Sequence, residues 1–134
     1  MRANFPAENL SSETYQHLLD IAEPLRSPQG AVLISEGDQN RALFIVESGS
    51  LTVSQQTGSG EEELGIIETG DVVGEIAFVD QRPRSATVTI REDARLLKLG
   101  HAAVMHAMVD HPAALADLVQ ALAVRITLRF RDHL

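Results

Sequence analysis

The feature that most restricts the fold is a succession of short apolar runs between residues 31 and 99. Runs this short, separated by turn residues, are typical of β-strands, whereas a helix needs about ten residues or more of 3.6-residue periodicity. Six strands are expected, at residues 31–34, 43–47, 50–54, 63–67, 86–90 and 95–99. Their spacing predicts a compact sandwich or barrel of antiparallel strands.

Turn-forming and acidic residues are expected to divide these strands. Ser48-Gly49 and Glu92-Asp93 each predict a turn between two separate strands. The glutamates at 61–63 predict the solvent-exposed edge of a hairpin, where like charges keep the edge strand from pairing with other chains.

Helical periodicity appears on both sides of this β region. Residues 10–26 predict an N-terminal helix with Ser11 as its N-cap, ended by the turn sequence at 28–30. Residues 101–131 predict C-terminal helices, first a short one at 101–109 and then a longer one. Pro112 suits the first position of this last helix, whose apolar stripe follows at helical spacing.

Length and composition predict one folded domain over residues 1–134, with no room for a second. Hydrophobic residues make up 44% of the chain and charged residues 22%, which is ordinary for a globular protein. No apolar run reaches the roughly 18–20 residues of a membrane span. The first five residues lack the apolar core of a signal peptide, so we expect a soluble cytoplasmic protein.

Charge and cysteine content exclude several classes of function. The formal net charge of −8 argues against binding to nucleic acid or to an anionic membrane, because phosphate neutralisation needs basic clusters. A local pocket can still bind an anion where one guanidinium and several backbone N–H groups outweigh distant carboxylates. The chain has no cysteine, which excludes disulfides, thiolate nucleophiles and cysteine-ligated metals.

Residues 70–85 interrupt the strand pattern and carry the groups best suited to an anionic ligand. Gly74, followed by a short helical turn, would present free N–H groups and the positive end of a helix dipole. Arg84 supplies a planar charged fork that can meet a phosphate bidentately. Glu75 is an acceptor suited to a ribose hydroxyl. Together they predict a ligand with one phosphate and an adjacent free sugar hydroxyl.

Residues 74–88, GEIAFVDQRPRSATV, resemble the phosphate-binding cassette of the cyclic-nucleotide-binding domain family. That cassette reads approximately G-E-(L/I)-A-(L/F)-x-x-x-x-P-R-x-A-T-V. The similarity continues through residues 36–38, 43–46 and 49–53, and downstream through 96–99, 111–112 and 122–126. It implies a mainly β fold with flanking helices: an antiparallel β jelly-roll barrel with an N-terminal helix, a short phosphate-binding helix and C-terminal helices.

The resemblance also implies a role for each matching residue. Glu75 should accept from the ribose 2′-hydroxyl, and Arg84 should pair with the charged oxygen of the cyclic phosphate. Gly74 should allow close backbone approach. The remaining site is expected to comprise the backbone at Val73, Ile76, Ala77, Ser85 and Ala86, with Arg129 or Phe130 on the last helix as a lid over the base.

Several of these residues have a plainer interpretation. Arg84 could be a surface arginine paired with Asp80 or Glu75, and Ser85 could be only a turn residue. Arg129 and Phe130 could form an exposed helix end or part of a dimer seam. The histidines at 101, 106 and 111 do not suggest a metal site, because a spacing of five rotates each about 140° from the last on a helix.

The sequence therefore predicts a non-catalytic sensor that binds cAMP or cGMP, with cAMP favoured, and needs no cofactor or metal. The ligand would reposition the C-terminal helix and so signal to an effector in trans, with a homodimer expected through that helix. The alternative is a structural or interaction domain that keeps this fold without binding nucleotide. An enzyme is not expected, because no serine or histidine lies in a recognisable catalytic motif.

Overall fold

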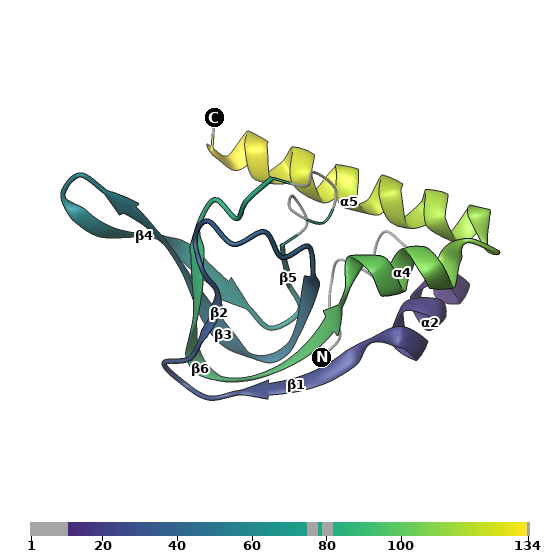
Figure 1. The fold of residues 1–134 in the computed structure, drawn as a ribbon, viewed down its shortest axis with the longest axis horizontal. Coiled ribbons are helices and arrows are strands. Elements are labelled where there is room, and N and C mark those ends of the chain that lie inside the picture. The colour runs from purple at the N-terminus through teal and green to yellow at the C-terminus, as the bar shows by residue number, and fades with distance from the viewer. Residues whose placement is uncertain (1–10, 75–77, 79–81, 134) are drawn as a thin grey trace.

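The computed structural model describes residues 11–74, 78 and 82–133, with side chains described as far as residue 124. Within these residues it contains helices packed against one six-stranded antiparallel sheet (Figure 1). The helices are α2 (Ser12–Ile21), α4 (His101–Met108) and α5 (Pro112–His133). The strands are β1 (Glu23–Ser27), β2 (Val32–Ile34), β3 (Leu43–Thr57), β4 (Gly60–Glu68), β5 (Val72–Val73) and β6 (Thr87–Leu99).

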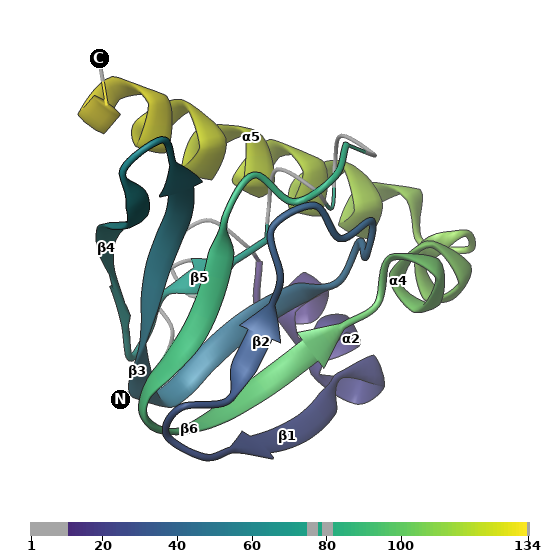
Figure 2. The ribbon, with the colours of Figure 1, turned by 60° about the vertical axis from the view of Figure 1, so that its left-hand side comes forward.

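Strands β3 and β6 form the centre of the sheet, whose order is β1-β6-β3-β4. Each long strand pairs with different neighbours along its length. Strand β3 pairs first with β5 and later with β4, while β6 pairs first with β2 and later with β1. The sheet therefore curls into a roll, and α5 lies across it (Figures 1 and 2). The predicted mainly β fold with flanking helices is confirmed.

The two turns predicted inside the β region are wrong. Ser48-Gly49 lies within β3 and Glu92-Asp93 lies within β6, so four expected strands are two bent ones. The pairing of β3 with β6 shifts register at three points between Val46 and Leu51. Gly49 has a φ of 92°, and a Cβ there would lie 2.5 Å from the Asp93 carbonyl oxygen. The glycine bends a paired strand because only glycine fits so closely against the facing backbone.

The predicted N-terminal helix over 10–26 is also wrong at its C-terminal end. Helix α2 ends at Ile21, and β1 then pairs with β6, with Leu25 opposite Leu96. Pro24 explains the difference, because proline has no backbone N–H and biases the residue before it towards extended conformations. The N-cap is confirmed, since the Ser11 hydroxyl accepts from the Thr14 N–H at 3.2 Å.

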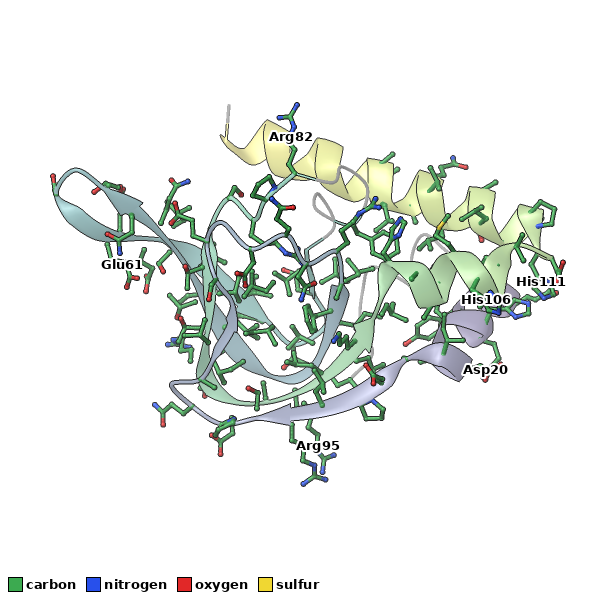
Figure 3. All side chains as sticks on the ribbon, viewed as in Figure 1. Asp20, Glu61, Arg82, Arg95, His106 and His111 are labelled. Carbon is green, nitrogen blue, oxygen red and sulfur yellow. The ribbon has the colours of Figure 1, made fainter. Side chains whose placement is uncertain are left out.

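The other predicted elements agree with the structure. Helices α4 and α5 begin at His101 and Pro112 as expected. The acidic run at 61–63 lies exposed on the edge strand β4, and Figure 3 shows Glu61 on the protruding β3–β4 hairpin. No helix in the described part of the chain is long and apolar enough to cross a membrane.

The core has two parts, one on each face of the central strands. Side chains of Leu43 and Ile45 pack with the helices, while those of Phe44 and Val46 face the interior of the roll. The helix-side core also holds Leu18 of α2, Val104 and Met108 of α4, and Leu118 and Leu122 of α5. Because both faces are covered, the run at 43–46 is continuously apolar instead of alternating.

The bend at Gly49 gives a test of this architecture. Gly49→Ala is expected to lower the free energy of unfolding by about 1–3 kcal/mol from backbone strain alone, and the clash with the Asp93 carbonyl adds to this loss. Gly58→Ala is the matched control, because a Cβ at Gly58 meets nothing within 4 Å. Urea unfolding of both variants measures the difference. Equal stability of the two would contradict a strict need for glycine at the bend.

Candidate ligand site around Arg84 and Gly74

Arg84 lies in the segment that leads into β6, and only 6% of its surface is exposed. Its guanidinium reaches two other segments of the chain, residues 40–42 and Gly74. Nη2 donates to the Ala42 carbonyl at 2.6 Å and to Asn40 Oδ1 at 3.3 Å, and Nη1 donates to the Gly74 carbonyl at 3.3 Å. The alternative of a surface arginine is therefore wrong. Burying a cation is costly, and these oxygen dipoles offset part of that cost.

The backbone of Arg84 is fixed as firmly as its side chain. Its N–H donates to the Asp38 carbonyl at 2.6 Å, and its own carbonyl accepts from the Gly37 N–H at 2.8 Å. The glycine turn at 36–38 thus holds the arginine against the start of β3. The sequence similarity included this turn, but no local pattern indicated that it pairs with Arg84.

Gly74 follows β5 directly and lies against the Arg84 guanidinium. Its φ is 95°, and a Cβ there would lie 2.6 Å from Arg84 Nη1 and 2.7 Å from the Ala42 carbonyl oxygen. Glycine is therefore needed for contact between the strand end and the arginine. The Phe78 N–H donates to the Gly74 carbonyl at 3.0 Å, and Phe78 has helical backbone, in keeping with the expected helical turn.

The other predicted site residues have mixed surroundings. Ser85 is exposed, and its carbonyl accepts from Gln55 Nε2 at 2.9 Å. Ala86 is half-buried, while the Val73 side chain belongs to the core and its backbone pairs with Phe44. The structure does not describe four of the residues named above, which are Glu75, Ile76, Ala77 and Asp80. For Arg129 and Phe130 it describes only the backbone, which belongs to α5.

Three neighbours of this site were missed by sequence reasoning. Asn40 Oδ1 accepts from the Ala42 N–H at 2.7 Å, which turns the chain so that the Ala42 carbonyl faces Arg84. Arg41, between them, donates from Nη2 to the Phe78 carbonyl at 2.9 Å. An asparagine three residues before the apolar run at 43–46 was the available signal for this turn.

A histidine lies next to the site on the helix side. The His101 ring, at the first position of α4, meets the Phe78 ring edge-on with centroids 5.1 Å apart. Burial, and to a lesser extent the positive charge of Arg41, lowers the pKa of His101 below its ordinary value. The neutral imidazole is therefore favoured beside the arginine.

The structure also has a cavity of about 610 Å³ elsewhere, between α2 and the start of α5. His17 and His111 line it with their rings 4.3 Å apart, and so do Glu13 and Asp117. The lining residues that the structure describes include no arginine or lysine, so this cavity does not suit a phosphate. No three described histidine or acidic side chains are grouped closely enough to hold a metal ion.

Comparisons with known proteins show the family to which the chain is similar. The profile of the cyclic nucleotide-binding domain matches residues 24–111. The cAMP-dependent protein kinase regulatory subunit of Aspergillus niger is 30% identical over 83 residues, covering 62% of this chain and 20% of that protein. The chain thus spans about a fifth of the length of this relative.

Solved structures extend the similarity to the whole fold. The N-terminal domain of a transcriptional regulator from Streptomyces coelicolor A3(2) superimposes with a TM-score of 0.83 at 26% identity, covering 96% of this chain and 91% of that one. The regulatory domain of Toxoplasma gondii PKA, solved with cAMP, superimposes with a TM-score of 0.72 at 29% identity. This match covers 84% of this chain and 42% of that one. The family match spans well over half of the sequence, and this chain belongs to the cyclic nucleotide-binding domain family.

Proposed function

We propose that this chain is a non-catalytic, cytoplasmic sensor module that binds cAMP in preference to cGMP. The phosphate lies at the junction of Gly74 and Arg84, and Glu75 accepts from the ribose 2′-hydroxyl. The backbone N–H groups of Ala77, Ser85 and Ala86 complete the phosphate site, while Arg129 or Phe130 covers the base. No cofactor or metal is involved.

The burial of Arg84 beside Gly74 is the observation that carries this proposal. A guanidinium has five N–H donors in a fixed plane and keeps its charge at any physiological pH. In a chain of net charge −8, such a buried cation provides a local attraction for one anion. Its hydrogen bonds to Ala42 and Gly74 hold the fork in one orientation before the ligand arrives, which lowers the entropy cost of binding.

Phe78 supports the proposed signalling step. Its N–H is bonded to Gly74, while its ring lies in the helix-side core with Val104 of α4 and Leu118 of α5. A shift of the cassette on ligand binding therefore changes the packing of both helices. The ligand moves α5 only to the extent that it binds better when the helix is in one position than in the other.

The preference for cAMP is supported by the proteins that resemble this chain. The Aspergillus niger relative is named for its dependence on cAMP, and the Toxoplasma gondii structure was solved with cAMP bound. The exposed Ser85 hydroxyl can serve the phosphate, or it can donate to or accept from a guanine. Comparison of both nucleotides on Ser85→Ala will show which of these roles the hydroxyl has.

Titration calorimetry with cAMP and cGMP tests the binding proposal. Arg84→Lys keeps the charge but loses the bidentate fork, so its Kd for cAMP is expected to rise about tenfold or more. Arg95→Lys is the matched control, since Arg95 is exposed and Figure 3 shows it on the side of the sheet opposite α5. It should bind like the wild type.

The structure also favours one specific competitor to this function. The Arg84 guanidinium already donates to three oxygens of its own chain, as expected if the arginine only ties the roll together. That reading predicts no heat with either nucleotide at high micromolar concentration for wild-type protein shown to be folded. Unchanged cAMP affinity in folded Arg84→Lys would likewise contradict the proposed role of this residue.

We further propose that α5 forms a homodimer through its outer face and that the module acts on an effector in trans, without direct contact to nucleic acid or membrane. The exposed residues of this face between 113 and 124 carry no charge; Val119 and Val124 are 52% and 40% exposed. Such a face would be covered by the same face of a second copy.

Sedimentation velocity at 5–100 µM (on the order of the usual range for weak dimers) tests this second proposal. Wild-type protein is expected to sediment as a dimer, and Val119→Glu as a monomer, because the charge would be buried unpaired. Val109→Glu is the control, since Val109 is exposed beyond the end of α4. A monomeric wild type across this range would rule out the dimer.

A further inference from the structure

Arg41 contacts the far end of the same short segment whose near end Arg84 holds. Arg84 Nη1 donates to the Gly74 carbonyl at 3.3 Å, whereas Arg41 Nη2 donates to the Phe78 carbonyl at 2.9 Å. The Phe78 N–H in turn donates to the Gly74 carbonyl at 3.0 Å. Each described end of this segment, Gly74 and Phe78, is therefore bonded to its own arginine.

The Phe78 carbonyl is a group that needs such a partner. A backbone carbonyl that is buried without a hydrogen-bond partner costs free energy. The Phe78 residue is only 4% exposed, so water has little access to it. The Arg41 guanidinium supplies a charged donor to this carbonyl at 2.9 Å, and such a charge-assisted hydrogen bond is stronger than one between neutral groups.

The position of Arg41 lets it connect the central sheet to Phe78, which is distant in the sequence. Arg41 follows Asn40, whose side chain turns the backbone, and precedes β3, so it is anchored by the most central strand of the sheet. The hydrogen bond to Phe78 spans 37 residues of sequence. Arg41 therefore ties the cassette to the rigid part of the fold without being part of any strand pairing.

We propose that Arg41 is a positioning residue of the ligand site, which holds the Phe78 carbonyl and thereby keeps the hydrogen bond from Phe78 to Gly74, at the end of β5 that faces Arg84, in the geometry that receives the phosphate. This inference rests on the proposed function and adds a residue outside the 74–88 cassette. Arg41 acts through Phe78 and has no contact with the ligand in this role. Its charge also adds to the local positive potential beside Arg84.

Two variants separate the hydrogen bond from mere side-chain bulk. Arg41→Met keeps an apolar stem but removes both the donor and the charge, and its Kd for cAMP is expected to rise about tenfold. Arg41→Lys keeps a donor and the charge, and should recover cAMP affinity to within about threefold of wild type. Arg95→Met is the matched control on the far side of the sheet and should bind as wild type does.

A second measurement needs no ligand. In Arg41→Met the amide of Phe78 is expected to exchange its hydrogen faster by NMR, because its turn is held less firmly. The amide of Val46, which donates to the Asp71 carbonyl at 2.9 Å, should exchange at the wild-type rate. The pKa of His101 should rise in Arg41→Met and stay low in Arg41→Lys, since the Arg41 charge helps to lower it.

These outcomes distinguish the inference from the proposed function. Wild-type cAMP affinity in Arg41→Met, or equal acceleration of exchange at Phe78 and Val46, would overturn the role of Arg41 and leave cAMP binding intact. A folded wild type that binds neither nucleotide would overturn the proposed function, and the ligand role of Arg41 with it. Rescue of affinity, exchange rate and His101 pKa by lysine supports the inference.

Discussion

The pairing of β3 with β6 is the constraint on which the rest of the structure depends. Both strands are long, and both bend where Gly49 packs against the carbonyl of Asp93. The bend lets each strand exchange neighbours along its length, so one sheet closes into a roll with two cores. A side chain at Gly49 would separate the facing backbones, and the sheet could not curl at that point.

The same bend creates the candidate ligand site. It brings the approach to β3 and the end of β5 to one end of the roll, where Arg84, in the approach to β6, bonds to both. Burying this arginine is tolerable only because the backbone already turns carbonyls towards it. The glycine at position 74 serves the packing of this arginine, since its missing Cβ leaves the space for the guanidinium.

Phe78 connects the helices to this site. Phe78 has its backbone held by Gly74 and Arg41, while its ring contacts His101 and the helix-side core. A small displacement of Phe78 would change the packing of this core, because closely packed cores accommodate shifts poorly. In the proposed function, this packing couples ligand binding to α5.

Sequence alone determined the strand-rich fold, the N-cap at Ser11, the helix start at Pro112 and the family of the cassette. These depend on local residue preferences or on a specific short pattern, which neighbours in sequence suffice to specify. Tertiary structure decided that residues 23–27 form a strand, that Gly49 bends β3 instead of ending it, and that Arg84 is buried against Ala42. The contact between Arg41 and Phe78 was also decided by the tertiary structure. Each of these features depends on a partner tens of residues away, and only the closed roll brings those partners into contact.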